Sequence, residues 1–266
     1  MSTILDGLEI AIVRPGGNDT ALVKGIILDP NKKKIINDAI MKKRPSIEQV
    51  GFYSYNQTNN TAVLEMAGGE FCGNATRALA YLLLKGKKGE ITVKVSGAKS
   101  LLAAGVKKPG TAFASMPIYK SYRSVTLYKS NLIRVNLQGI THLISPLPKD
   151  MSKTQLIQNA KKLLSANGLL TSLPAAGVMY VSQRIRNEIS IDPIVWVRDI
   201  QTLFYETACA SGSTAVGLWQ AKCFGKKSMA VLQPSVQTIN VFITNSDSGF
   251  ESAYIDGSIR LITKLI

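Results

Sequence analysis

Two stretches of this 266-residue chain share one pattern and lie about half a chain apart. They read GGEFCGNATRALA (residues 68–80) and YETACASGSTAVG (residues 205–217). Each places a cysteine, Cys72 or Cys209, in a turn of small residues that opens an Ala-, Leu- or Val-rich segment. Such a segment predicts a helix that begins at the cysteine. Because the pattern occurs twice, the chain is expected to fold on a duplicated plan.

The segments around these stretches repeat as well. Each half of the chain reads as strands, a helix, more strands, the cysteine-capped helix and further strands. We therefore predict an α+β protein of two pseudo-symmetric domains, residues 1–117 with Cys72 and residues 118–266 with Cys209. The last strand of the chain is free to cross back to the first domain. A cleft between the domains would receive both helix N-termini.

The chain is expected to begin with a β-hairpin, strands 8–14 and 20–28, whose wide loop carries Asn18. The predicted helices cover residues 31–44, 72–84 and 151–166, with a last one from residue 209 onward. In that last helix Cys223 lies one turn beyond Trp219, so we expect Cys223 to pack in the core.

Few residues are suited to metal or redox chemistry. There are three cysteines and no CxxC pair, and His142 is the only histidine, so we expect reduced thiols and no zinc site. Residues 1–10 do not resemble a signal peptide, and no stretch approaches the roughly 18 consecutive apolar residues of a membrane span. The chain is predicted to be soluble and cytoplasmic, with no membrane partner. No lysine motif for pyridoxal phosphate stands out, and we expect no cofactor.

The net charge of +15 raises the question of a nucleic-acid partner. The lysines are dispersed in short pairs and triplets that fall in expected turns and helix ends. We interpret them as a solvated surface and expect no nucleic acid. A non-catalytic protein that binds nucleic acid or an acidic partner through this surface stays open as an alternative.

The two cysteine turns suggest acid–base chemistry on an amino acid. A helix N-terminus offers free N–H groups that bind an anion, and it favours a thiolate with a lowered pKa on an exposed cysteine. Gly73, Asn74, Ala210 and Ser211 are small or turn-forming, so the backbone can approach a substrate carboxylate closely. With the Cα between the sulfurs, one thiolate would remove the α-proton and the opposite thiol would return one. Two inert, buried cysteines that only cap helices are the plainer alternative.

Four segments resemble motifs of the diaminopimelate epimerase family of cofactor-independent amino acid racemases. Residues 72–77 (CGNATR) resemble the family's CGNGxR motif, and residues 209–212 (CASG) its CGTG or CGSG motif. Residues 139–142 (GITH) are similar to its GNPH segment, and residues 16–18 to its Gly-Asn hairpin. The resemblance implies two domains, each a β-sheet wrapped on a central helix, with the active site in the cleft between them.

The chain departs from that family where the substrate is held. Ile140 and Thr141 replace the Asn and Pro of GNPH, and Gly177 stands at the position of a later asparagine. The loop with a Glu-Arg pair before the second cysteine is shortened to residues 205–208. In diaminopimelate epimerase these elements help to hold the distal end of the substrate, so their loss argues against diaminopimelate.

A closer resemblance is to the histidine racemases of staphylopine-type metallophore biosynthesis. It covers residues 69–76 (GEFCGNAT), the segment EQVGF (residues 48–52) and a glutamate, Glu206, three residues before the second cysteine. The resemblance implies that Asn18, Glu48 and Glu206 contact the amine or side chain of the substrate. Ala210 stands where glycine is usual after the second cysteine.

We therefore expect a cofactor-independent, two-base racemase that converts L-histidine to D-histidine for opine-metallophore synthesis, with a free amino acid as its partner molecule. A diaminopimelate epimerase or a racemase of another cationic amino acid is the alternative within the fold. Phenazine-type isomerases do not use a cysteine pair, which speaks against them. A homodimer stays open.

Overall fold

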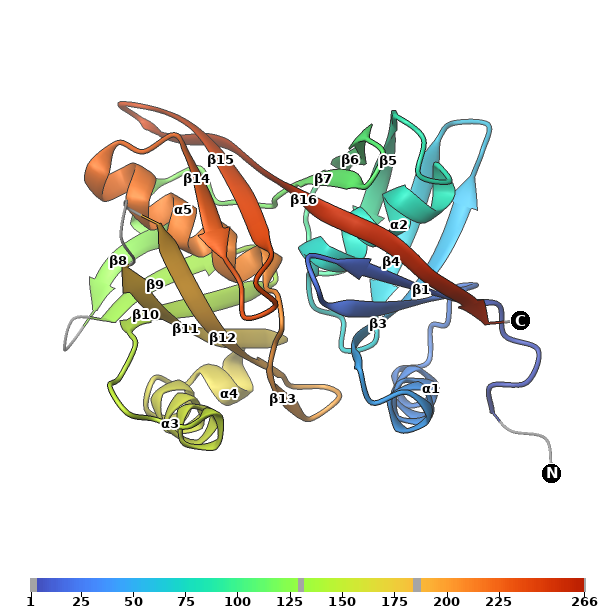
Figure 1. Cartoon of the computed structure of the whole chain (residues 1–266), viewed down its shortest axis with the longest axis horizontal. Helices are drawn as coiled ribbons and strands as arrows, with labels where there is room; N and C mark the ends of the chain where they lie inside the picture. Colours follow the sequence, from blue (N-terminus) through green and yellow to red (C-terminus); the bar gives the residue numbers. More distant parts are fainter. Residues whose placement is uncertain (1–3, 129–131, 184–187, 266) are drawn as a thin grey trace.

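The computed structural model describes residues 4–128, 132–183 and 188–265. Figure 1 shows two lobes side by side, each with strands around one helix, α2 in the first lobe and α5 in the second. A long strand, β16 (Gly249–Leu265), runs from one lobe to the other. The fold is thus α+β with a mixed sheet, in agreement with the predicted class.

In the described ranges, the first lobe has two helices and seven strands of its own, and it shares β16. In chain order its elements are β1 (Ile10–Pro15), β2 (Asp19–Lys24), α1 (Pro30–Lys43), β3 (Ile47–Asn56), β4 (Thr61–Met66), α2 (Gly73–Leu83), β5 (Gly89–Val95), β6 (Leu102–Lys108) and β7 (Thr111–Ser115). Consecutive strands pair from β1 to β7, and β16 pairs with both β7 and β1, so the sheet closes around α2. The first eight residues of α2, 73–80, are buried as a result.

The second lobe repeats this arrangement with an open sheet. Its elements are a short 3₁₀ turn (Tyr122–Ser124), β8 (Val125–Tyr128), β9 (Leu132–Leu137), β10 (Ile140–Pro146), α3 (Lys153–Ala166), α4 (Leu169–Ser172), β11 (Ala175–Gln183), β12 (Ile189–Val197), β13 (Thr202–Tyr205), α5 (Ala210–Phe224), β14 (Ser228–Leu232) and β15 (Thr238–Ser246). Helix α5 packs on β9, β10 and β15 and is buried from residue 210 to 218. Helices α3 and α4 cover the outer face of β11 with a separate small core.

Strand β16 belongs to both lobes. Its residues 249–257 pair with β15, residues 254–258 pair with β7, and residues 259–265 pair with β1. A division of the chain at residue 117 therefore leaves part of the first lobe's sheet to the end of the chain. No helix in the described ranges is long and apolar enough to cross a membrane.

Two local predictions differ from the structure. The second hairpin strand ends at Lys24 and not at residue 28, because Gly25 turns the chain with a φ of +108°. Cys223 was expected in the core and is exposed, because the last turn of α5, residues 222–224, lies at the surface.

Candidate active site

The two cysteines occupy equivalent positions at the starts of α2 and α5. Cys72 caps α2 with its sulfur 3.3 Å from the N–H of Ala75, and Cys209 caps α5 with its sulfur 3.4 Å from the N–H of Gly212. Their backbones are nearly identical, with φ and ψ of −131° and 109° at Cys72 and −127° and 108° at Cys209. Both helices begin directly after their cysteine, as predicted.

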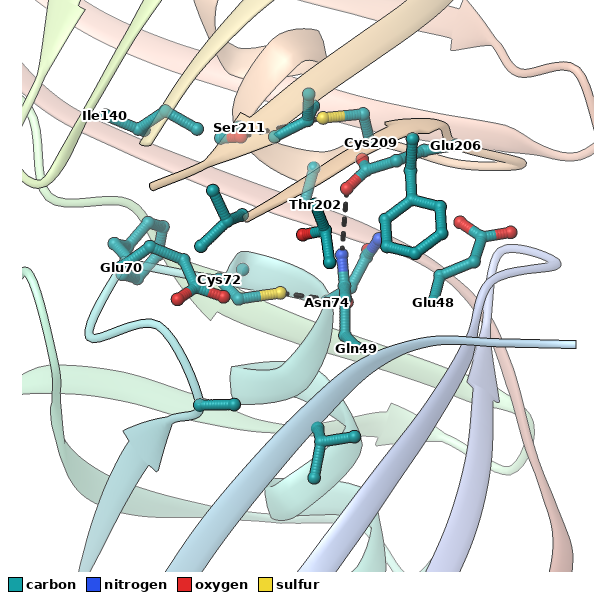
Figure 2. A pocket seen from close by; sticks show the side chains of 18 of the residues that line it. Glu48, Gln49, Glu70, Cys72, Asn74, Ile140, Thr202, Glu206, Cys209 and Ser211 are labelled. Carbon is teal, nitrogen blue, oxygen red and sulfur yellow. Dashed lines mark hydrogen bonds between the residues drawn. The ribbon is translucent and has the colours of Figure 1, made fainter. Parts of the chain in front are cut away.

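The two helix N-termini meet between the lobes. A Cβ atom built on Gly73 would lie 2.9 Å from the Cβ of Ala210, closer than two carbon atoms can pack. Glycine at position 73 therefore allows the helices to approach this closely. The same junction brings both cysteines to one cavity, drawn in Figure 2.

That cavity is lined by both lobes and encloses little space. Its enclosed volume is about 30 Å³, room for no more than a few water molecules. The lining residues are Glu48, Gln49, Val50, Ala67, Glu70, Phe71, Cys72, Gly73, Asn74, Ile140, Val195, Val197, Ile200, Thr202, Phe204, Glu206, Cys209, Ala210 and Ser211. Both cysteines and all the small residues expected beside a substrate carboxylate are among them.

Neither thiol is exposed, contrary to the expectation from the helix N-termini. Cys72 is 7% exposed and Cys209 is 3% exposed. Burial raises the pKa of both thiols well above the usual range, and the negative charge of Glu206 raises it further. The helix N–H groups lower the pKa of each sulfur only in part. Both cysteines are therefore neutral thiols in the free protein.

Among the described residues, three carboxyl groups line the cavity and no lysine, arginine or histidine does. Burial is the main cause that raises the pKa of Glu48 and of Glu70 to about 7 and that of Glu206 to about 8. Glu70 Oε2, Glu206 Oε2 and Thr202 Oγ1 are buried atoms without a hydrogen-bond partner in the described part of the chain. The cavity therefore has hydrogen-bond acceptors that can bind a cation. None of its described lining side chains carries the positive charge that would attract an anion.

Gln49 on β3 joins the two halves of the site. Its Oε1 accepts a hydrogen bond from the Cys72 thiol at 3.0 Å, and its Nε2 donates to Glu206 Oε1 at 3.2 Å. One side chain therefore orients the first cysteine and a glutamate of the opposite lobe (Figure 2). A change at Gln49 would disturb both.

Glu48 on β3 is held by hydrogen bonds from both lobes. It accepts from Asn18 Nδ2 at 2.6 Å, from the Thr207 hydroxyl at 2.6 Å and from the Thr207 N–H at 3.1 Å. Asn18 does not line the cavity, and its amide also donates to Ala208 O at 3.3 Å. Asn18 therefore lies behind Glu48, outside the residues that line the cavity.

Asn74 and Ser211 are the other polar side chains at the helix starts. Asn74 Nδ2 donates to Ala208 O at 2.8 Å across the lobe junction, and Ser211 Oγ lies 2.9 Å from His142 Nε2. Burial lowers the pKa of His142 to about 3, so its imidazole is neutral. Through His142, the segment of residues 139–142 therefore contacts Ser211 at the start of α5.

Several residues that line the cavity were not predicted from the sequence. Gln49 and Glu70 stood inside the motifs EQVGF and GGEFC but were assigned no role. Val195 and Val197 on β12 and Phe204 on β13 carry no sequence signal, because apolar strand residues are indistinguishable from core positions. No group of three or more His, Cys, Asp or Glu side chains within the described ranges is arranged to hold a metal ion.

We expect the ligand-free protein to lose stability as the pH rises from about 4.5 to about 8, because unfolded glutamates release their protons near pH 4.3 while the folded carboxyls keep theirs in this window. The pKa values of Glu48 and Glu70, raised to about 7, and of Glu206, raised to about 8, set the upper end of the window, where the loss is complete. His142, whose pKa burial lowers to about 3, acts in the opposite direction below its unfolded pKa of about 6.5 and offsets only one of the three carboxyls there. Melting temperatures across this range test the expectation, and Glu206→Gln should flatten the curve. A stability that stays level or rises in the parent protein would contradict it.

Comparison with solved structures identifies the fold. A hydroxyproline epimerase from Agrobacterium vitis, solved with bound trans-4-hydroxy-L-proline, superposes with a TM-score of 0.65 at 10% identity over 97% of this chain and 90% of that one. A PhzF-family phenazine biosynthesis protein from Enterococcus faecalis gives a TM-score of 0.59 at 13% identity, covering 97% of both chains. The fold is that of racemase- and epimerase-like isomerases.

Sequence comparison narrows the class to one family. The family described as "Histidine racemase CntK N-terminal domain" matches residues 8–264. A histidine racemase of Fusobacterium nucleatum is 30% identical over 270 residues, 97% of this chain and 95% of that protein. A histidine racemase of Staphylococcus aureus is 24% identical over 80% of this chain and 79% of that protein. The chain belongs to the histidine racemase family.

Proposed function

We propose that this protein is a histidine racemase that inverts the Cα of L-histidine without a cofactor. One observation carries the proposal: two cysteines cap two facing helices on a single cavity, whose lining in the described part of the chain includes three glutamates and no basic side chain. One cysteine would accept a proton and the other would donate one. The glutamates would supply the negative charge that a cationic substrate needs. The family to which the chain belongs supports histidine as that substrate.

The helix starts would hold the substrate carboxylate. Gly73, Asn74, Ala210 and Ser211 of the first turns line the cavity, and the N–H groups of a first helical turn favour negative charge. As the α-proton leaves, charge develops on this carboxylate as an enediolate, so the same N–H groups would stabilise the transition state. The Cα then lies between Cys72 and Cys209, one on each face.

Burial of the thiols serves the proton transfer. A sulfur whose pKa is raised by burial is a stronger base once it is ionised. Its pKa then lies closer to the very high pKa of the α-proton, so proton transfer is less uphill. As the cationic substrate binds, one thiol gives up its proton to solvent and becomes a thiolate. This thiolate removes the α-proton, and the neutral thiol on the other face delivers its own proton to Cα. The cysteines thereby exchange states, and the positive charge of the substrate offsets the thiolate.

The carboxyl groups explain the preference for a cation. A buried carboxylate without a positive partner is costly, and the cavity offers such oxygens at Glu70 and Glu206. An ammonium and an imidazole would satisfy them. Glu48 already accepts hydrogen bonds from Asn18 and Thr207, so its role at the substrate is electrostatic and it also holds the lobes together.

The proposal includes the domain arrangement. We assign the fold to the two-domain type of diaminopimelate epimerase, with domains at residues 1–117 and 118–266 that share β16. A cavity of about 30 Å³ does not hold an amino acid, so the lobes would part to admit it and close to exclude water. We also extend the proposal to a cytoplasmic role in opine-metallophore synthesis, which a neighbouring opine dehydrogenase gene would support.

The test is racemisation in deuterium oxide with no cofactor added. We expect L-histidine to yield D-histidine that carries one deuterium at Cα, detected by chiral chromatography and mass spectrometry. Parallel reactions with L-lysine, L-arginine and diaminopimelate decide between histidine and the other cationic substrates. No inversion and no exchange with any amino acid would refute the proposal, and salt-dependent binding of DNA or RNA by such an inactive protein would favour a binding role.

A further inference from the structure

We propose that Glu70 accepts a hydrogen bond from the imidazole N–H of the substrate and so determines which side chain the enzyme takes. This inference rests on the proposed racemase function and adds a residue for the side chain. Neither the two cysteines nor the pair Glu48 and Glu206 gives the substrate side chain a hydrogen-bond partner of its own.

Glu70 is a buried acid with an unused acceptor. It is 7% exposed, it lines the cavity, and its Oε2 has no hydrogen-bond partner in the described ranges. Main-chain N–H groups of Gly68 and Glu70 lower the pKa of this carboxyl, but burial outweighs them and leaves it at about 7. The charges of Asp199, which raises this pKa, and of Lys33, which lowers it, have smaller effects than burial and the main-chain hydrogen bonds. The carboxyl therefore ionises readily when a cation or an N–H donor enters.

The main chain around Glu70 is fixed in place. Ser96 Oγ donates to Glu70 O at 2.7 Å. A Cβ atom on Gly97 would lie 2.6 Å from Phe71 N and 3.0 Å from the Glu70 carbonyl carbon, so this turn packs directly on Gly97. A rigid support of this kind suits a residue that must discriminate between ligands.

The surroundings of Glu70 fit a flat ring. A Cβ atom on Gly68 would lie 2.8 Å from Glu70 Oε2, 2.3 Å from Val197 Cγ1 and 3.5 Å from Ile200 Cγ1, so the carboxylate adjoins apolar side chains of the second lobe. The carboxylates of Glu48 and Glu206 lie among hydrogen-bonding groups. An apolar wall with one acceptor matches an imidazole, whereas the polar cluster matches an ammonium.

The geometry of a bound amino acid separates the two glutamate sites. The Cα has four substituents: its proton faces a sulfur, and its carboxylate lies on the helix N-termini. The ammonium and the side chain must then point in two different directions. Figure 2 shows Glu70 on the Cys72 and Ile140 side of the cavity, with Glu48 on the other side. With the ammonium beside Glu206 and Glu48, the side chain reaches Glu70.

The test is Glu70→Gln, which keeps the size of the side chain and removes its charge. Loss of a hydrogen bond to a charged acceptor should raise both the KM and the Kd for L-histidine about 10- to 100-fold, with a smaller change in kcat. The Kd is measured by calorimetry, and L-phenylalanine, which lacks a ring N–H, should not bind more weakly to the variant. Glu90→Gln, the same change at an exposed position outside the cavity, is the matched control.

Two outcomes would overturn the inference: a Kd and KM for L-histidine within about threefold of the parent, or a fall in kcat at constant KM. A circular dichroism spectrum and melting temperature like those of the parent exclude misfolding of Glu70→Gln as the cause of weaker binding. If the parent protein binds L-histidine but does not invert it, the racemase proposal fails, while the calorimetric comparison still decides the role of Glu70.

Discussion

Replacing either Cys72 or Cys209 by serine should lower the rate of histidine inversion by about 10²- to 10⁴-fold, the range that a positioned acid or base contributes. Serine fits the space of the buried thiol and can still cap its helix, so the fold should persist. Its hydroxyl ionises far less readily than even a buried thiol and does not serve as a base. The rate is measured by chiral chromatography of each enantiomer as the starting substrate.

The third cysteine provides the matched control for this prediction. Cys223 is exposed at the end of α5 and does not line the cavity, so Cys223→Ser should keep the parent rate. In deuterium oxide each single active-site variant should retain exchange for at most one enantiomer, because the remaining thiol reaches only one face of Cα. Equal loss in the Cys223 variant, or normal inversion without Cys72, would contradict a two-cysteine mechanism.

Local sequence patterns were sufficient to predict the helix starts and the pairing of the two halves. Capping and helix periodicity act within a few residues, so Cys72 and Cys209 marked the starts of α2 and α5 without any knowledge of the fold. The repeated order of elements then placed both starts in one site, and the two cysteines do line a single cavity.

What the sequence could not predict depends on contacts between residues far apart. The raised pKa of the thiols follows from burial between two lobes and from the charge of Glu206, neither of which a helix N-terminus reveals. Gln49 was missed because its bond to Glu206 joins residues 157 positions apart. Cys223 was misplaced because helix periodicity does not show where a helix leaves the core.

Adding one methyl group at Gly73 should lower kcat/KM about 10- to 100-fold, because displacements of less than 1 Å between catalytic groups have effects of this size. The Cβ of an alanine at position 73 would lie 2.9 Å from the Cβ of Ala210, and neither atom can rotate away. The starts of α2 and α5 must therefore move apart, and both sulfurs move with them. The steady-state kinetics of Gly73→Ala with L-histidine measure this effect.

A second substitution can relieve this clash, because the methyl group of Ala210 is the nearest opposing atom. The other close atoms, Met116 Cε and Sδ at 3.1 Å, belong to the end of a flexible side chain that can move. In the double variant Gly73→Ala with Ala210→Gly, the methyl group has moved from the start of α5 to the start of α2. The clash between two Cβ atoms is then absent, and the helix starts can keep their distance. We expect at least about a tenfold recovery over Gly73→Ala alone, which a double-mutant cycle expresses as a coupling of about 1.4 kcal/mol. Additive effects of the two substitutions would mean that the distance between the helix starts does not control the reaction. A full cycle with the expected coupling would show that the close contact of the two helix N-termini sets the positions of the cysteines.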